Sequence, residues 1–527
     1  MYKRIVSLLL VCLGLSCTVL AGCNSKEIPD TETNLIISLY EGGYGTAAFE
    51  KIADKFEEHY ADDGYTVTII PDPALVGSSV LSRIQSGPQV TPTDLFLPGD
   101  VNYRQIILRG SNFIRGYDYA LEELTDLFGQ KVYGEDVTYG SKLDEQYADG
   151  CAIEVNGETK YFTVPFMGGI SGLAYNSDLL DGLFGEDGWE LPNTTDELYT
   201  LIGQIRTAGA TPFVWASGTG YWDYCVYPWW RQLVTDEEAE NFWNCIDEYG
   251  EVSAEVFKSQ ALLTAFTALQ QCIGDTANSH PKSMTFTHIE AQMALYDTTN
   301  KVAMMPTGDW LENEMKYSGY EPGQVDIGLM KVPVISDVIY TYDSIGNKQF
   351  KYQTIQSDEK LSEVIAAIDA NGPRPQEVSE EDYAAIEKIR SYTNSNGFLF
   401  NAMIPVYANA KEAAKKFLLY MASDEAQQIF YDETGALLPY STEKLKTPEN
   451  PTRLQKAVLD SLGKTTYISN KIQKNPIFYN TDLECWQNNI EGYIGTTSDD
   501  KMTALQFWTW NYEQYSENFD LYLSMAQ

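Results

Sequence analysis

The sequence is poor in basic residues. It has 36 Lys and Arg against 75 Asp and Glu in 527 residues, which gives a formal net charge of −39 at pH 7. Nucleic acids and anionic membrane surfaces are bound through basic patches, so this balance argues against both as partners. It also disfavours a strongly anionic ligand, although a local cluster of Arg and Lys could still hold one. We interpret the acidity mainly as a soluble, self-repelling surface.

Beyond the N-terminus, no apolar stretch is long enough to span a bilayer. Residues 1–22 are typical of a secretory signal, with two basic residues before an apolar run. The segment ends in Leu-Ala-Gly-Cys at Cys23, which resembles the lipobox where bacterial lipoproteins are cleaved and lipidated on cysteine. The resemblance implies a lipid anchor on Cys23 at the extracellular face of the cell membrane and a flexible tether over residues 23–33. The alternative is an ordinary signal peptide that releases the protein.

The sequence has few cysteines and histidines from which to form disulfides or a metal site. Of the eight cysteines, two lie in the signal and Cys23 is the lipidation candidate, so five remain: Cys151, Cys225, Cys245, Cys272 and Cys485. An odd, sparse set in a large exported protein is not a disulfide scaffold, although Cys225 and Cys245 could pair. There is no CxxC, and the three histidines do not stand at zinc spacing with cysteine. We therefore expect no metal centre and no cofactor.

Catalytic signatures are also missing. The sequence contains no GxSxG, no HExxH and no Cys/His signature of known spacing. The turn Gly42-Gly43-x-Gly45 lacks both common phosphate-loop patterns, which argues against that role. Many carboxylate pairs must arise by chance among 75 acids. We therefore predict that the chain is not an enzyme, with a surface carbohydrate-active enzyme as the weaker alternative.

Strand and helix patterns alternate along the first hundred residues. Residues 34–40 (NLIISLY) form a buried-strand run, residues 49–60 carry apolar side chains at helical spacing, and residues 65–69 alternate as a strand. A helix-compatible stretch then leads to another short strand at 93–98. This order predicts an α/β fold with a doubly wound parallel sheet. In such sheets ligands bind beyond the carboxyl ends of the strands.

Six landmarks, taken in order, resemble the extracellular solute-binding proteins of the maltodextrin-binding type, which serve ABC importers. They are the helix at 49–60, a glycine-rich crossover at 164–176, a capped helix start at 192–198, a strand and Gly-x-Trp turn at 303–310, paired helices at 413–427, and Thr-Gly…Pro at 434–439. Together they cover most of the chain after the signal. The chain is longer than the family usually is. A polar stretch at about 339–396, with one expected helix at 380–391, accounts for much of the excess.

The resemblance implies a two-lobed, periplasmic-binding-protein-like fold, with doubly wound sheets joined by a hinge of crossing strands that closes around ligand. The lobes would comprise 34–165 plus 332–438 and 166–331 plus 439–527, with crossings near 165–168, 332–333 and 439. Gly168 and Gly169 would lie in the hinge, where glycine permits flexing and close backbone approach. A plain tight turn is the alternative for these glycines, and the two roles are compatible.

A sugar ligand needs flat aromatic rings for its ring face and carboxylates or amides for its hydroxyls. Positions after strand ends favour these candidates: Glu41, Tyr44, Asp100, Tyr221, Trp222, Asp309 and Trp310, with Trp486 as a late second-lobe contact. The resemblance singles out Trp310 as a stacking aromatic. Asp100 and Asp309 could instead cap helices, and any single aromatic could belong to the core.

The function that the resemblance implies is capture of a carbohydrate for the permease subunits of an ABC importer by a monomer. The chain's size and its 10 Trp and 36 Tyr favour an oligosaccharide. A peptide or a cation is the alternative ligand, which carboxylates clustered in the cleft would favour. The membrane would be reached only through the lipid, and no nucleic acid partner is expected.

Overall fold

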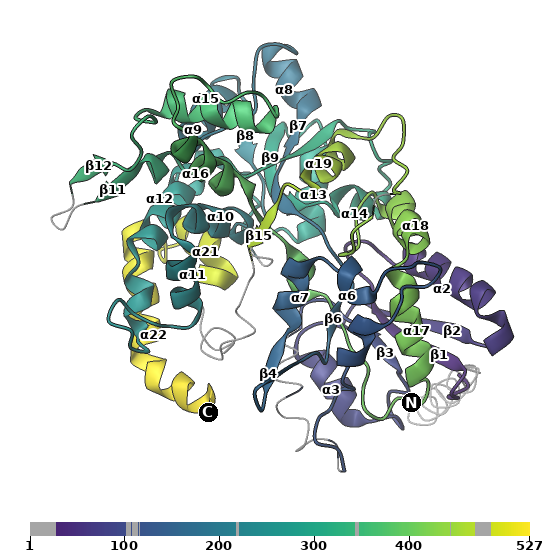
Figure 1. Cartoon of the computed structure of the whole chain (residues 1–527). Coiled ribbons are helices and arrows are strands. Elements are labelled where there is room, and N and C mark those ends of the chain that lie inside the picture. The colour runs from purple at the N-terminus through teal and green to yellow at the C-terminus, as the bar shows by residue number, and fades with distance from the viewer. Residues whose placement is uncertain are drawn as a thin grey trace, which may run out of the picture.

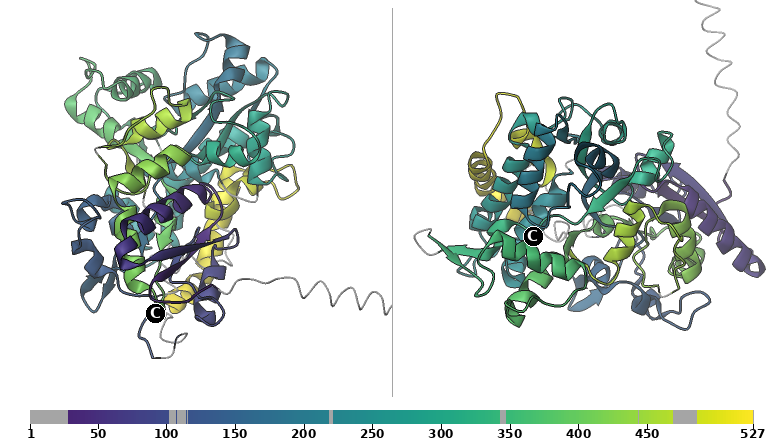
Figure 2. Two further views of the ribbon diagram at one scale, coloured as in Figure 1. Left: turned by 90° about the vertical axis from the view of Figure 1, so that its right-hand side faces the viewer. Right: turned by 90° about the horizontal axis from the view of Figure 1, so that it is seen from above.

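The computed structural model describes residues 28–526 except 102–106, 108–113, 115, 218–220, 343–346, 443 and 469–485. Cys23 lies outside the described residues, so its lipidation stays a prediction. The described chain forms two lobes (Figure 1). One is built around the strands β1 (Asn34–Tyr40), β2 (Thr66–Asp72) and β3 (Leu95–Leu97), and the other around β7 (Ser171–Asn176), β8 (Thr211–Phe213) and β9 (Val302–Gly308). Viewed from above, the purple N-terminal elements lie to one side of the teal helices of the second lobe (Figure 2).

The first lobe is built on a three-stranded parallel sheet. β1 (Asn34–Tyr40) is its central strand, between β2 (Thr66–Asp72) and β3 (Leu95–Leu97). Six of the seven residues of β1 are buried, as expected for a parallel strand covered on both faces. Helix α2 (Ala47–His59) packs Phe49 and four other residues of one face into the core. The parallel α/β arrangement predicted from the sequence is thus confirmed here.

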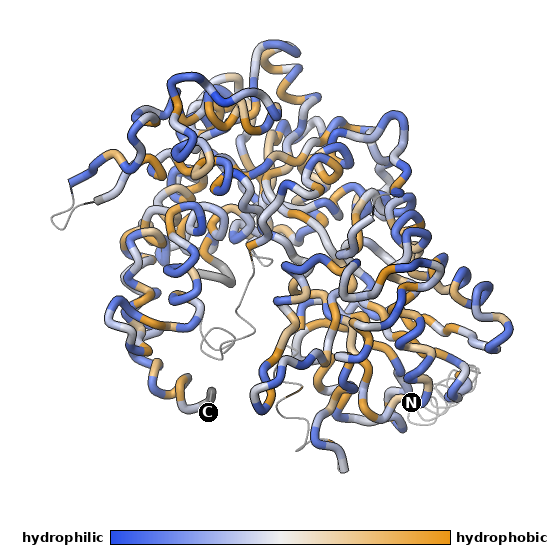
Figure 3. The backbone as a smooth tube through the Cα atoms, in the orientation of Figure 1, coloured by the Kyte–Doolittle hydropathy of each residue, from blue (hydrophilic) through white to orange (hydrophobic). Residues whose placement is uncertain are grey.

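Shorter elements complete the first lobe. They are α3 (Ser78–Ser86), α6 (Tyr139–Lys142), α7 (Glu145–Cys151), β4 (Ile153–Val155), β5 (Glu158–Lys160), β6 (Val164–Pro165), β14 (Asn401–Ala402), α17 (Lys411–Met421) and α18 (Asp424–Thr434). Hydrophobic segments, drawn in orange, follow the strands of this lobe, whereas its outer turns and helix ends are blue (Figure 3). β14 pairs with β6, so the chain has returned to the first lobe by Asn401.

The second lobe is built on a six-stranded mixed sheet with β7 (Ser171–Asn176) near its centre. β9 (Val302–Gly308) runs antiparallel to β7, and β8 (Thr211–Phe213) lies parallel to β9 beyond it. Every residue of β7 and β9 is buried, because helices cover the sheet. β9 therefore brings its carboxyl end, Gly308, to the end of the sheet where β7 begins, next to the first lobe.

The other edge of β7 is shared by two strands. β10 (Ile327–Met330) pairs with the Leu173–Asn176 part of β7, and β13 (Tyr392–Asn394) pairs at Ser171. β15 (Thr466–Ile468) lies parallel to β13 and ends the sheet. β10 thus leaves the sheet at the place where β13 enters it.

Most of the second lobe is helical. Its other elements are α8 (Ser177–Phe184), α9 (Thr195–Thr207), α10 (Asp223–Leu233), α11 (Asp236–Trp243), α12 (Gln260–Ile273), α13 (His288–Tyr296), α14 (Leu311–Tyr317), β11 (Tyr340–Tyr342), β12 (Lys348–Phe350), α15 (Asp358–Asp369), α16 (Glu380–Ser391), α19 (Arg453–Ser461), α21 (Trp486–Ile494) and α22 (Ala504–Ala526). α22 packs along α12 (Figure 1). In the part of the chain that the structure describes, no helix is both long and apolar enough to cross a membrane.

The segment from 332 to 395 packs in the second lobe, which corrects its assignment to the first. Leu361 of α15 and Ile386 of α16 join the same core as Trp229. β13, which follows α16, pairs within the second sheet. The physical reason is that the buried faces of α15 and α16 complete the core around α10. The return crossing therefore lies between β13 and β14, some sixty residues later than the expected crossing at 332–333.

The expected hinge glycines lie in the segment that joins β6 to β7. The N–H of Gly168 donates to the carbonyl of Leu437 at 3.2 Å, and Ser395 Oγ donates to the carbonyl of Gly169 at 2.7 Å. A Cβ at Gly168 would stand 2.9 Å from the Leu437 oxygen, too close for any residue but glycine. Chain segments from three parts of the sequence therefore run side by side here. Bending at these glycines remains a prediction.

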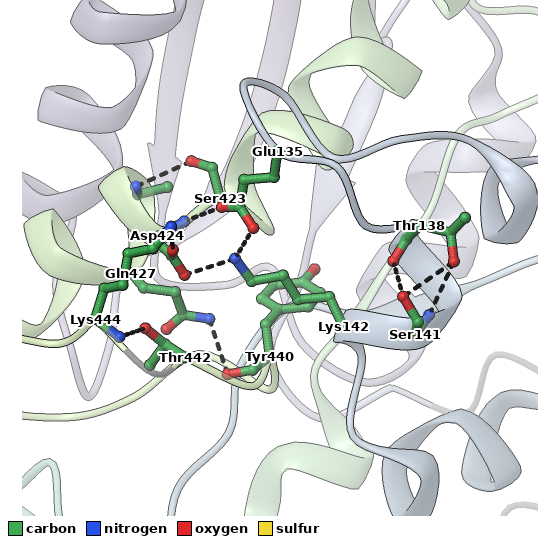
Figure 4. A network of polar contacts seen from close by, with 11 residues as sticks. Glu135, Thr138, Ser141, Lys142, Ser423, Asp424, Gln427, Tyr440, Thr442 and Lys444 are labelled. Carbon is green, nitrogen blue, oxygen red and sulfur yellow. Dashed lines mark hydrogen bonds and ion pairs between the residues drawn. The ribbon is translucent and has the colours of Figure 1, made fainter.

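A polar network holds the last of these segments to the first lobe (Figure 4). Lys142 Nζ, on a side chain only 5% exposed, forms ion pairs with Glu135 and, at 2.7 Å, with Asp424. Gln427 Nε2 donates to the carbonyl of Tyr440 at 3.3 Å. Removing one partner of a buried ion pair is strongly destabilising, since it leaves a buried charge uncompensated. The network therefore fixes α6, α18 and the chain at Tyr440 to one another.

Candidate functional site

The glycine-rich turn after β1 docks against α14 of the second lobe. The N–H of Gly43 donates to Glu314 Oε1 at 3.2 Å, and Asn313 Nδ2 donates to the carbonyl of Gly43 at 2.8 Å. Gly43 has φ +56°, a conformation that glycine adopts without the strain another side chain would bring. The turn is thus an interlobe contact, in which the backbone N–H and carbonyl of Gly43 are bonded to side chains of α14.

Tyr44 and Asp309 meet inside this contact. The Tyr44 hydroxyl donates to Asp309 Oδ1 at 2.5 Å, and the N–H of Ile170 donates to Oδ2 at 3.4 Å. Tyr44 is 5% exposed and Asp309 1%. Burial raises the pKa of Asp309 to about 6, although both hydrogen bonds lower it. The sequence predicted that Tyr44 and Asp309 contact ligand, but in the structure they are hydrogen-bonded to each other. Contact with a ligand would therefore require the lobes to separate.

Trp310 stands at the centre of an aromatic group from both lobes. Its ring is edge-on to Tyr44 at 6.4 Å, Tyr221 at 6.2 Å and Tyr224 at 5.9 Å between centroids. It is 6% exposed and packs with the core of the first lobe, although its own strand belongs to the second. Tyr221, stacked on Tyr224 at 5.1 Å, is only partly buried. The more accessible ring of this group is therefore that of Tyr221, and stacking of a ligand on Trp310 stays a prediction.

Tyr40 and Tyr221 approach from opposite lobes. Tyr40 is the last residue of β1, and its ring is closely flanked by Gly42 and Gly99: a Cβ at either would lie 2.5 Å and 3.1 Å from ring atoms. Burial raises the pKa of Tyr40, and the carboxylates of Glu314 and Asp100 raise it further. Burial also raises the pKa of Tyr221, with Glu314 and Tyr40 adding to the effect. The two phenols thus lie near one carboxylate at the junction of the lobes.

Asp223 and Asp100 place further carboxylates at the same junction. Burial raises the pKa of the Asp223 carboxyl well above its usual range, and the charges of Glu491 and Asp100 raise it further. Asp100 keeps solvent access, yet surrounding protein atoms desolvate its carboxyl and raise its pKa. Asp223 Oδ1 is buried without a hydrogen-bond partner. An unpaired buried acceptor is costly, so a ligand hydroxyl or amino group that donates to it would stabilise the site.

Three other predicted contacts have different outcomes. Glu41 is exposed after β1 and its role stays a prediction. Trp222 is fully buried and packs edge-on against Phe213 at 5.1 Å, so it belongs to the core, which corrects its assignment to ligand. The reason is that Trp222 points inward where Tyr221 points to the lobe junction. Trp486 begins α21, but its side chain lies outside the described part.

Tyr40, Asp223 and Glu314 were missed in the sequence. Tyr40 ends a strand and Asp223 is two residues beyond Tyr221, so the same strand-end criterion would have found both. Glu314 sits on a helix, and only its contact with Gly43 reveals it. Among the described residues, no group of three or more His, Cys, Asp or Glu is placed to hold a metal ion.

Comparisons with known proteins agree with this architecture. The sequence model of the family "Bacterial extracellular solute-binding protein" matches residues 42–348. The multiple sugar-binding protein of Streptococcus mutans serotype c is 24% identical over 311 residues, which are 59% of this chain and 65% of that relative, so the match spans less than two thirds of its length.

Solved structures of solute-binding proteins share the fold. RafE in complex with raffinose has a TM-score of 0.56 at 16% identity, covering 91% of this chain and 99% of its own. The GacH receptor of Streptomyces glaucescens gives 0.56 at 16%, with 94% and 99% covered, and the bacterial solute receptor AcbH gives 0.59 at 15%, with 92% and 99% covered. The shared fold confirms the predicted α/β periplasmic-binding-protein fold, and the family match confirms the prediction of a binding protein rather than an enzyme. The chain therefore belongs to the bacterial extracellular solute-binding proteins.

Proposed function

We propose that the protein captures a carbohydrate, an oligosaccharide in particular, in a cleft between its lobes. The observation that carries the proposal is the set of phenols and carboxylates from both lobes at one junction: Tyr40 and Asp100 from the first, Tyr221 and Asp223 from the second. Phenol rings offer flat surfaces for a sugar ring, and carboxylates accept hydrogen bonds from its hydroxyls. Relatives whose bound sugars are known, such as RafE with raffinose, support the same class of ligand.

Closure of the lobes would complete the site. The contacts of Gly43 with α14 and of Tyr44 with Asp309 belong to an arrangement in which the lobes touch. Ligand would enter when these contacts open, and its contacts with both lobes would then favour closure. The closed, loaded protein would be the form that the permease subunits of an ABC importer receive. Cys23 would keep it at the extracellular face of the membrane through its acyl chains.

Calorimetric titration of the mature protein with raffinose, a chitin oligosaccharide and galactose tests the ligand class. One of these, or a related oligosaccharide from a wider thermal-shift screen, should bind saturably and raise the unfolding temperature, since ligand that binds only the folded state stabilises it. Tyr221→Ala should weaken that binding by about 1–3 kcal/mol. Tyr249→Ala, at an 81% exposed tyrosine of the second lobe, is the matched control and should leave affinity unchanged. Equal affinity of wild type and Tyr221→Ala would remove Tyr221 from the site.

A cationic solute is the second candidate, and the unpartnered Asp223 oxygen beside Asp100 favours it. An ammonium group would donate to these carboxylates and offset their mutual repulsion. Spermidine and glucosamine, titrated beside glucose, separate the two candidates. Binding of spermidine with no response to any neutral sugar would replace the sugar proposal.

The anchor is tested separately in cells. Cys23→Ala should abolish incorporation of a labelled fatty acid into the protein and move it from the membrane fraction to the medium or periplasm. Unchanged labelling and fractionation would refute lipidation at this residue.

A further inference from the structure

A cavity of about 760 Å³ lies in the second lobe, apart from the phenols and carboxylates of the lobe junction. Its lining includes residues of β10, β13, α15, α16 and α19, and Figure 1 shows where the three helices lie. Its volume is in the range of pockets that hold small molecules. Part of its wall comes from the 332–396 segment, which adds α15, α16 and β13 to the lobe.

Three cations line the wall, and two of them pair with the same carboxylate. Arg390 Nη2 pairs with Asp369 Oδ2 at 2.6 Å, and Lys331 Nζ lies 3.6 Å from Asp369 Oδ1. Lys464 lines the same cavity from its exposed rim. Burial lowers the pKa of Lys331, Asp369 opposes this, and the positive charges of Arg390 and Lys464 lower it again. Three cations and one carboxylate thus lie close together here, in a protein whose net charge is −39.

The remaining charges of the wall do not remove this excess. Lys456 and Asp460 form an ion pair with each other at 2.5 Å within α19, so they compensate locally. Glu387, exposed on α16, is the other carboxylate that lines the cavity. Between the charged groups the wall carries hydroxyls and amides, namely those of Asn193, Asn371, Ser391, Thr393, Thr465 and Thr466.

Arg390 is held in place before any ligand arrives. It is 7% exposed, Asp369 engages its Nε and Nη2, and Nη1 donates to the carbonyl of Val332 at 3.1 Å. A guanidinium in a fixed orientation loses little side-chain entropy when an anion binds. Lys331 and Lys464 add ammonium donors to the same wall.

We propose that this cavity is a second binding site, which takes a small molecule through a phosphate or carboxylate group held by Lys331, Arg390 and Lys464. The anion would neutralise the surplus positive charge, and the surrounding hydroxyls and amides would bind the polar remainder of the molecule. Because the residues that line this cavity include none of the phenols and carboxylates of the lobe junction, this proposal does not depend on the sugar proposal.

Titration calorimetry on the mature protein without sugar tests this site, with inorganic phosphate, citrate, glucose 6-phosphate and glucose as probes at constant ionic strength. We expect saturable binding either of phosphate and glucose 6-phosphate or of citrate. Glucose and additional chloride should not bind. Phosphate binding without citrate binding assigns the site to phosphate groups, and the reverse assigns it to carboxylates. No saturable binding of any anionic probe would overturn the proposal.

Variants locate the binding. Lys331→Gln and Lys464→Gln should each weaken the anion by about tenfold, since each removes one charge-assisted contact. Both lysines retain solvent access, and thermal unfolding checks that each variant folds. Lys456→Gln, on the same wall but paired with Asp460, is the matched control and should change affinity little. Glu387→Gln should strengthen binding. Equal weakening by the Lys456 variant would show that the anion responds only to general charge, and no weakening by the other two variants would show that it binds elsewhere. Either result would refute the site.

Discussion

Tyr44 of the first lobe and Asp309 of the second are joined by a buried hydrogen bond of 2.5 Å. The bond connects the turn after β1 with the turn after β9, two strands from different sheets. It stands beside Gly169, where a Cβ would lie 2.7 Å from the Tyr44 hydroxyl oxygen. The hinge segment and the interlobe contact therefore meet at one place, so a change at either residue should affect both stability and lobe closure.

The carboxyl of Asp309 should make stability depend on pH. Burial raises its pKa from 3.8 to about 6, so the folded protein holds this proton more tightly than the unfolded chain. The contribution of Asp309 to stability is therefore full below about pH 4 and is lost as pH rises through about 6, a loss of about 3 kcal/mol. Asp309→Asn removes it, and urea unfolding of both proteins across this range measures the difference. If the difference in unfolding free energy between wild type and Asp309→Asn stays constant with pH, the raised pKa of Asp309 would be contradicted.

Removing the Tyr44 hydroxyl should destabilise the closed arrangement. Tyr44→Phe keeps the ring packed between Trp310 and Phe430 but leaves Asp309 Oδ1 without its donor. The expected cost is about 1–3 kcal/mol in unfolding free energy. Small-angle scattering should show a larger radius of gyration without ligand, because the lost contact spans the lobes. Tyr249→Phe is the control, and equal stability and size of the Tyr44 variant would show that the bond contributes nothing.

Local patterns predicted several elements of the fold, but they missed α15 and did not predict which lobe each segment joins. The apolar run at 34–40 is β1, and α16 spans the expected 380–391. The 332–396 segment was misassigned because its polar composition hides the buried stripes of α15 and α16, whose partner α10 is more than a hundred residues away. Helical periodicity shows that one face of a helix is apolar. It does not show which core that face packs against, because the partner is distant in the sequence.

The sequence predicted the region of the candidate site better than it predicted the individual residues of that site. The strand-end criterion selected the segments after β1, β3, β8 and β9, which do meet at the lobe junction. Tyr221 and Trp222 are neighbours in sequence, yet one is partly accessible and the other fully buried, because adjacent side chains at a helix start point in different directions. Glu314 became visible only through its contact with a turn 271 residues away.

Gly42 should control the orientation of the Tyr40 ring. A Cβ at Gly42 would lie 2.5 Å from the ring, so Gly42→Ala must displace the phenol from its place near Asp100. If Tyr40 contacts ligand, affinity should fall by about tenfold while the fold persists, because the ring is half-buried and can rotate. Gly129→Ala, where a Cβ meets nothing within 4 Å, is the matched control. Unchanged ligand affinity in Gly42→Ala, with the displacement of Tyr40 verified by crystallography, would exclude Tyr40 from the site.

Asp369 should have the opposite pH dependence to Asp309. Burial alone would raise the pKa of Asp369, but Arg390 and Lys331 outweigh it and hold the pKa below its usual range. Its stabilising contribution is thus present at neutral pH and is lost as pH falls through the carboxyl range. Asp369→Asn should therefore destabilise the protein at neutral pH, since Arg390 stays buried without its counter-charge, and the difference from wild type should shrink in acid. Chemical unfolding at both pH values measures this, and a difference that grows on acidification would be incompatible with the ion pair as the source of stability.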